Sequence, residues 1–175
     1  MQALQNIYKS YVDKKPWLGI QSPSAQVRSF ERRFKTHSLI LDIGCGAGYD
    51  TYYLRQHGHH VISADIDSGV ADVVCDVVNM PFKDKYFDGV FCRGVLHLCC
   101  NPKKAFSELL RVGKNHSVMF VSYSLNVIGL GDEIQLAERP FYYGKAKFLY
   151  EHITRKNHQD HAHLFYSGVF RNEVH

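Results

Sequence analysis

The sequence lacks several features that would place it in a special class of protein. No hydrophobic run approaches the ~20 apolar residues that a membrane-spanning helix needs, and the N-terminal stretch has no apolar block of the kind found in secretory signals. The five cysteines are an odd number, so we expect reduced thiols and a cytoplasmic location. The net charge of +4 is smaller and less clustered than in dedicated nucleic-acid-binding proteins.

The composition is that of an ordinary globular protein, with 45% hydrophobic and 22% charged residues among 175. A chain of this length can bury a core without metal ions or disulfides. We expect a single domain over 1–175, in which 1–37 form a helical cover, 38–123 form the core and 124–175 form a C-terminal region.

Short apolar segments recur through the core, and they are hydrophobic throughout rather than alternating. Such segments are typical of strands that are buried on both faces of a parallel sheet. The strands predicted are 38–42, 60–65, 72–76, 87–92 and 117–123. With helices at 49–57 and 102–112 between them, the pattern predicts an α/β fold, namely a doubly wound, mostly parallel open sheet with helices on both faces.

The two ends of the chain have weaker patterns. Helical spacing predicts a helix at 2–14, and a serine followed by proline predicts a second helix from Ser22 and Pro23. The segments expected after residue 123 are a loop at 124–136, a helix at 141–153, a polar histidine-rich loop at 154–163 and a final strand within 164–170.

Acidic residues end three of the predicted strands, namely Asp42, Asp65 and Asp76. Ligands of open parallel sheets bind at the carboxyl ends of the strands. A glycine cluster at 44–48 follows the first strand, where backbone can approach a ligand closely because no Cβ intervenes. Acids at these places can accept hydrogen bonds from a ribose diol and from an adenine amino group. The pattern therefore favours a cleft for an adenosine-containing ligand over three separate turn-capping residues.

The glycine spacing distinguishes between adenosine-containing ligands. The segment LDIGCGAG (41–48) has G-x-G-x-G after an acid, whereas dinucleotide-binding sites have G-x-G-x-x-G. This segment resembles the first motif of class I S-adenosylmethionine-dependent methyltransferases. The resemblance, to the methyltransferase type 11 group, continues through 64–67, 75–76, 80–88, 94–97, 101–102 and 108–112. An ordered series of motifs is more specific than a single glycine loop.

The resemblance implies that 38–123 bind S-adenosylmethionine and that 124–175 lie on the substrate side. Asp42 and the glycines would hold the methionine part of the cofactor, Asp65 the ribose hydroxyls and Asp76 the adenine amino group. The residues that the resemblance assigns to cofactor binding are Asp42, Gly44, Gly46, Gly48, Asp65, Ile66, Asp76, Val77, Arg93 and Gly94.

The expected reaction is in-line displacement of the methyl group onto a small-molecule acceptor, which needs no base if the acceptor is already nucleophilic. His97 is the candidate general base, since histidine titrates near neutral pH, and shaping of its loop is the alternative role. Arg93 would pair with an anionic substrate or with a structural carboxylate. His97 lies near Cys99 and Cys100, but no second pair of ligands accompanies them, so no metal site is predicted.

The chain departs from the family pattern in three places, one of which is the turn at 112–116, where the family usually has Leu-Lys-Pro-Gly-Gly. The connection from Asp65 to Asp72 is too short for a helix, so a short crossover is expected there. Only 52 residues (175 − 123) follow the fifth strand, where the family has two helices and two strands, so the C-terminal part of the sheet is expected to be missing or rebuilt.

Three alternatives follow from these departures and from the motifs. The first is a cofactor-binding but catalytically silent truncated form or partner subunit, which would expose a sheet edge after the fifth strand and associate through it as a homo- or hetero-oligomer. The second is transfer of the methyl group to RNA or to a protein. The third is a nicotinamide-dependent oxidoreductase, against which the glycine spacing argues.

Overall fold

A computed structural model describes residues 22–66, 69–129, 132–135, 146–157 and 161–173. Its helices are α2 (Ala25–Glu31), α3 (Tyr49–Gln56) and α4 (Pro102–Val112). Its strands are β1 (Leu39–Ile43), β2 (His60–Asp65), β3 (Val73–Val74), β4 (Phe87–Arg93), β5 (Gly113–Gly129), β6 (Asp132–Gln135), β7 (Ala146–Asn157) and β8 (His161–Asn172).

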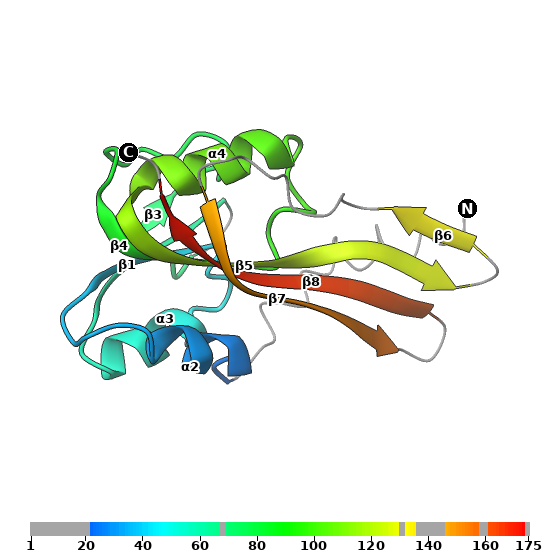
Figure 1. The fold of residues 1–175 in the computed structure, drawn as a ribbon, viewed down its shortest axis with the longest axis horizontal. Helices are drawn as coiled ribbons and strands as arrows, with labels where there is room; N and C mark the ends of the chain where they lie inside the picture. Colours follow the sequence, from blue (N-terminus) through cyan, green and yellow to red (C-terminus); the bar gives the residue numbers. More distant parts are fainter. Residues whose placement is uncertain (1–21, 67–68, 130–131, 136–145, 158–160, 174–175) are drawn as a thin grey trace.

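The strands form one eight-stranded sheet in the order β3-β2-β1-β4-β5-β8-β7, with β6 paired to β5 off this path. Strands β1 to β5 pair with one another in parallel, whereas β8 runs antiparallel to both β5 and β7, and β6 runs antiparallel to β5. Helix α4 covers one face of the sheet, and α2 and α3 cover the other (Figure 1). The predicted mostly parallel sheet with helices on both faces is confirmed.

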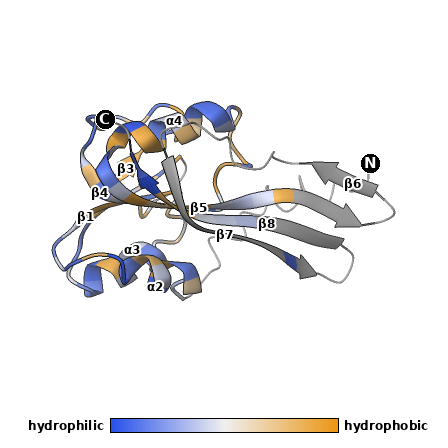
Figure 2. Cartoon of the chain, viewed as in Figure 1, coloured by the Kyte–Doolittle hydropathy of each residue, from blue (hydrophilic) through white to orange (hydrophobic). Residues whose placement is uncertain are grey.

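The central strands are buried on both faces because alternate residues point to opposite sides. Leu41, Val90 and Met119 belong to one core cluster together with Phe106 and Leu109 of α4. The other cluster contains Val27, Phe30, Ile40, Leu54, Phe91 and Phe120. Figure 2 shows hydrophobic residues on the central strands and mixed polarity on the helices. This arrangement explains why the strands read as continuous apolar segments.

Helices α2 and α4 each begin at a capping side chain, and the cap of α2 lies two residues after its expected place. The Asn101 side chain accepts a hydrogen bond from the Lys104 amide at 3.0 Å, with Pro102 in the first turn of α4, as predicted. Helix α2 was expected to start from Ser22 and Pro23, but its cap is Ser24. The Ser24 hydroxyl accepts a hydrogen bond from the Val27 amide, whereas the Ser22 hydroxyl lies too far back along the chain to do so.

The sheet beyond residue 123 differs from the prediction. The expected loop at 124–136 is wrong, because β5 continues to Gly129 and β6 follows it. The expected helix is wrong over 146–153, which belong to β7, and its first residues, 141–145, lie outside the described residues. The expected loop at 154–163 is wrong where β7 and β8 occupy it, whereas the final strand is confirmed and is longer than expected. Pairing with strands that are distant in the sequence determines the secondary structure of these segments, whereas local helical spacing does not.

The C-terminal strands rebuild the sheet instead of leaving it open. Strand β8 pairs with β5 from Val118 to Gly129, and β6 pairs with the outer part of β5 on its other side. The exposed edge expected after the fifth strand is therefore absent from the described residues. Strands β5, β8 and β7 run together past the carboxyl ends of the parallel strands (Figure 1). We call this extension, made of 123–129, 132–135, 151–157 and 161–166, the β-arm.

Three smaller predictions have structural outcomes. The connection between β2 and β3 is the short crossover that was expected, with Ala64 and Val73 paired in parallel. All five cysteines lie within the described residues, and none of them forms a disulfide. In the part of the chain that the structure describes, no helix is long and apolar enough to cross a membrane. The predicted helix at 2–14 lies outside the described residues.

Candidate active site

The glycine loop between β1 and α3 lies tightly against the end of β2. The amides of Gly44 and Cys45 both donate to the Ala64 carbonyl, at 2.7 and 3.2 Å. Gly44 has a φ of 76°, and a Cβ on it would overlap the side chain of Val95. Only glycine fits this position, because both its backbone conformation and its surroundings exclude a side chain.

Asp65 and the glycine loop are in direct contact. Asp65 ends β2, and its carboxylate accepts a hydrogen bond from the Gly46 amide at 2.9 Å. The next residue, Ile66, has an apolar side chain that is 65% exposed. An acid beside an exposed apolar side chain at the carboxyl edge of the sheet is the pair of groups expected for a ribose and an adjoining base.

Asp42 lies beneath the loop, where its side chain has almost no contact with solvent. Its carboxylate accepts a hydrogen bond from the Thr51 hydroxyl at 2.6 Å. The pKa of Asp42 is raised to about 7, chiefly by burial and also by nearby Asp50, while Thr51 and Arg93 act in the opposite direction. A cation held beside this group would favour its ionised form.

Asp76 and Val77 follow β3, the strand at one edge of the sheet. The Asp76 carboxylate accepts a hydrogen bond from the Val78 amide at 3.0 Å, which is the turn-capping role weighed from the sequence. Asp76 is nevertheless partly exposed, whereas Val77 is buried in the core. The structure therefore places Asp76 at the expected edge with one of its oxygens already used.

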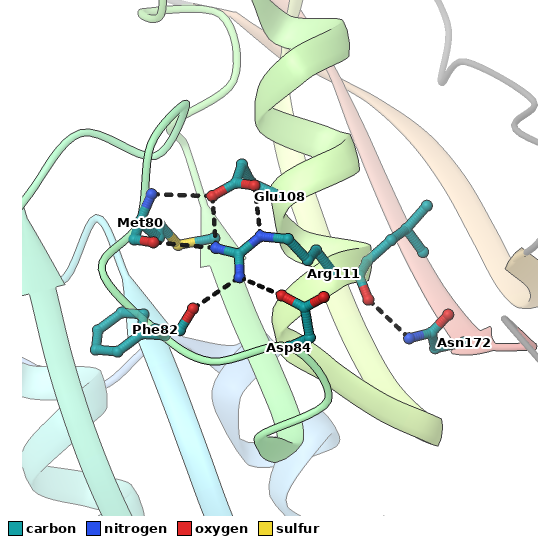
Figure 3. A network of polar contacts seen from close by, with 7 residues as sticks. Met80, Phe82, Asp84, Glu108, Arg111 and Asn172 are labelled. Carbon is teal, nitrogen blue, oxygen red and sulfur yellow. Dashed lines mark hydrogen bonds and ion pairs between the residues drawn. The ribbon is translucent and has the colours of Figure 1, made fainter.

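An arginine that the motif analysis did not single out holds the segment after Val77. Arg111 of α4 donates to the backbone carbonyls of Met80 and Phe82, at 3.0 and 2.7 Å. It also pairs with Glu108 and Asp84, and Glu108 accepts from the Met80 amide (Figure 3). The network fixes the segment 77–84, which follows Asp76, on α4. The signal in the sequence was the charged pair three residues apart on the predicted helix.

Arg93, at the end of β4, pairs with a structural carboxylate. Its Nε donates to Asp50 of α3 at 2.9 Å, and the other oxygen of Asp50 accepts from the Ser24 amide at 2.6 Å. Asp50 is 6% exposed. Sequence analysis missed this residue, although an acid in the first turn of the helix after the glycine loop was a usable signal.

His97 lies in the loop after β4, next to the β-arm. Its Nδ1 accepts a hydrogen bond from the Ser124 amide at 3.3 Å. A backbone N–H can only donate, so the neutral ring carries its proton on Nε2. His97 is therefore arranged as a hydrogen-bond donor, which does not suit the general-base role considered for it.

The neighbouring cysteines do not complete a metal site. The Cys99 thiol donates to the Leu96 carbonyl at 3.1 Å, and burial raises its pKa to about 11. No group of three metal-ligating side chains occurs among the residues that the structure describes. Of the histidines at 158, 161 and 163, the first lies outside these residues.

The structure brings most of the predicted site together at one edge of the sheet. Asp42, the glycine loop, Asp65 and Ile66 adjoin β1 and β2, and Arg93 and Gly94 follow the neighbouring strand β4. Asp65 offers a carboxylate and Ile66 an exposed apolar surface, which are groups that an S-adenosyl ligand can use. The fold and this edge resemble those of the class I S-adenosylmethionine-dependent methyltransferases.

Comparison with known proteins shows what the chain is similar to. Residues 41–121, a little less than half of the chain, match the family model described as a methyltransferase domain. A solved S-adenosylmethionine-dependent methyltransferase from Methanosarcina mazei superposes with a TM-score of 0.66, covering 89% of this chain and all of the other, at 15% identity. At that identity the likeness shows the fold alone.

Two curated relatives are similar over more than half of the chain. "Probable tRNA methyltransferase 9B" of Homo sapiens is 32% identical over 123 residues, which cover 62% of this chain and 26% of that protein. "Malonyl-[acyl-carrier protein] O-methyltransferase" of Hamiltonella defensa is 27% identical over 112 residues, which cover 58% of this chain and 42% of that protein. The chain thus spans between a quarter and a half of the length of these relatives.

Proposed function

We propose that the chain transfers a methyl group from S-adenosylmethionine to a small-molecule acceptor by in-line displacement. The observation that carries this proposal is the contact between the glycine loop and Asp65 at the end of β2. It joins a glycine-rich turn and a carboxylate at the edge of the sheet where open parallel sheets bind their ligands. S-adenosylmethionine is the cofactor of the family and supplies a methyl group on positively charged sulfur.

Each predicted cofactor residue has a proposed task. Asp65 would accept hydrogen bonds from the ribose hydroxyls, giving up or sharing its bond to the Gly46 amide, and Ile66 would pack on the adenine ring. The free oxygen of Asp76 would accept from the adenine amino group, with Val77 supporting it from the core. The groups proposed to hold the methionine part and the sulfonium are Asp42, the backbone of Gly44, Gly46 and Gly48, and Arg93 with Gly94.

The contribution of the chain to the reaction would be alignment and exclusion of water. Alignment of the reacting atoms at near-attack distance supplies roughly 7–11 kcal/mol of a barrier. We propose that His97 shapes the loop at the rim of the site through its hydrogen bond with the Ser124 amide, and that the β-arm covers the acceptor. Neither task requires a general base.

Transfer to RNA or to a protein is the second candidate function. The printed name of the human relative contains tRNA, and that of the bacterial relative contains a malonyl carrier protein. Small-molecule transfer is favoured here because the charge excess of the chain is only +4, and an RNA-binding surface usually needs more. A silent partner subunit is disfavoured because β8 covers the edge that such a subunit would expose.

The test is methyl transfer into separated cell fractions. The chain is incubated with methyl-labelled S-adenosylmethionine and with a cell extract divided into small molecules, RNA and protein. With the natural chain we expect label in the small-molecule fraction. We expect this label to be lost in Asp65→Ala and kept in Asp88→Ala, a control that removes an acid near the start of β4. Label in RNA or protein would contradict the acceptor class, and no label in any fraction would favour the silent subunit.

A further inference from the structure

The strand that leads to Asp76 is too short to fix the direction of its carboxylate. Strand β3 has only two residues at the end of the sheet, and within the described residues it pairs only with β2. One more backbone bond, from the Cys75 amide to the Asp65 carbonyl at 3.0 Å, extends this pairing by a residue. The direction of the Asp76 carboxylate therefore depends on the residues that follow it.

Asp76 is joined to those residues by a short turn. Its carboxylate accepts a hydrogen bond from the Val78 amide, and its carbonyl accepts one from the Asn79 amide, both at 3.0 Å. Val77 and Met80 are 5% and 4% exposed and belong to the core cluster that includes residues of α4. The turn and Met80 thus form one unit, so the contacts that hold Met80 also set the direction of Asp76.

Helix α4 holds Met80 by both of its backbone groups. The Met80 amide donates to the Glu108 carboxylate, and the Met80 carbonyl accepts from Arg111, both at 3.0 Å (Figure 3). Arg111 also donates to the Phe82 carbonyl at 2.7 Å, and two of its nitrogens donate to Glu108 at 2.6 and 2.8 Å. The Arg111 hydrogen bonds hold the pKa of Glu108 below its usual range, so this carboxylate is ionised at neutral pH.

A guanidinium suits this task because its donors lie in one plane and point in fixed directions. All three nitrogens of Arg111 are used, on the two carbonyls of Met80 and Phe82 and on the carboxylates of Glu108 and Asp84. The Asp84 side chain is 72% exposed, against 16% for Glu108, so the ion pair with Asp84 contributes less than the inner contacts. A segment anchored in this way loses little conformational entropy when it binds a ligand.

We propose that Arg111 is a positioning residue for base recognition, because it holds the segment 77–84 so that the Asp76 carboxylate faces the amino group of the bound adenine. This inference rests on the proposed function, in which Asp76 accepts from that amino group. A carboxylate can only accept hydrogen bonds, so a base with a carbonyl oxygen at the same place is repelled. A carboxylate that cannot turn away makes the site selective for adenine.

Binding of S-inosylhomocysteine tests this inference, because its base has a carbonyl oxygen in place of the adenine amino group. Calorimetry of the full chain compares this ligand with S-adenosylhomocysteine, and the ratio of the two dissociation constants does not depend on the folded fraction of a variant. For the natural chain we expect a ratio of about tenfold or more in favour of adenine. Arg111→Met should lower this ratio at least threefold, whereas Lys104→Met, an exposed position on the same helix, should leave it unchanged.

Two further variants show whether Arg111 acts through Asp76. Asp76→Asn should itself remove most of the discrimination, because an amide can turn to donate to the carbonyl oxygen. Adding Arg111→Met to Asp76→Asn should then lower the ratio no further. Glu108→Gln weakens the same contacts with Arg111 in place, and it should also lower the ratio, so it replaces Arg111→Met if that variant does not fold.

The results that would overturn the inference differ from those that would contradict the proposed function. Equal affinity of the natural chain for the two ligands would overturn the inference. An unchanged ratio in both Arg111→Met and Glu108→Gln, or a further loss in the double variant, would also overturn it. A natural chain that does not bind S-adenosylhomocysteine at all would instead contradict the proposed function.

Discussion

Single residues at the edge of the sheet have requirements that the sequence shows only in part. The glycines and the acids Asp42, Asp65 and Asp76 could be located from the sequence, because strand ends and glycine spacing are local patterns. Contacts between residues that are distant in the sequence could not be located in this way. Asp50 joins Arg93 and Ser24, which lie 43 and 26 residues away, and nothing in the local sequence records that contact.

The glycine loop provides the first prediction at this scale. Gly44→Ala is expected to destabilise the fold more than Gly94→Ala. Both residues have positive φ, 76° and 74°, so each variant incurs the ~1–2 kcal/mol that a left-handed backbone costs a residue with a Cβ. Only at Gly44 would the new Cβ also overlap Val95, which adds about 1–3 kcal/mol. Urea unfolding of the two variants measures the difference, and equal losses would show that the loop has room.

Asp42 gives a prediction for pH. Its native pKa of about 7 exceeds the unfolded value of 3.8, so the native state holds the extra proton between these values. This group therefore makes stability fall as pH rises from about 4 to 7, by up to about 4 kcal/mol. We expect Asp42→Asn to be more stable than the natural chain at pH 8, and we expect the difference between their unfolding free energies to narrow toward pH 5. A gap that is constant with pH, or that widens in acid, would contradict the burial of a neutral carboxyl.

At the scale of elements, the sequence predicted a helix or strand correctly where residues close to it in the sequence stabilise it. Asn101 and Pro102 start α4 by local bonds, and the apolar strands β1 and β4 are buried whatever their order in the sheet. Strand β7 is different, because its residues have helical spacing and become a strand only through pairing with β8. The pairing energy is not a property of the segment itself.

The network around Arg111 gives the prediction at this scale. Arg111→Met keeps the apolar stem and removes the donors to the Met80 and Phe82 carbonyls. We expect a loss of about 2–3 kcal/mol in unfolding free energy, together with faster amide hydrogen exchange in 77–84. Lys104→Met, an exposed position on the same helix, is the control and should change neither. Unchanged exchange in 77–84 would show that Arg111 does not hold the segment.

At the scale of the whole molecule, the C-terminal residues complete the sheet and extend it past the carboxyl ends of the parallel strands. Asn172 fixes this arrangement, since its buried side chain donates to the carbonyls of Leu110 and Gly113, both at 2.9 Å. The sequence showed that 52 residues are too few for the family pattern of two helices and two strands. It could not show that they form long strands, because these strands pair with β5 and with one another across turns of the chain.

The central claim is that the glycine loop and Asp65 form a site for S-adenosylmethionine, and calorimetric titration of the full chain tests it most directly. S-adenosylmethionine, S-adenosylhomocysteine and NAD are titrated in turn into the natural chain, Asp65→Ala and Asp88→Ala. We predict micromolar binding of the first two ligands, no binding of NAD, loss of binding in Asp65→Ala and retention in Asp88→Ala. A folded natural chain that binds neither S-adenosyl ligand, or that binds NAD equally well, would contradict the account.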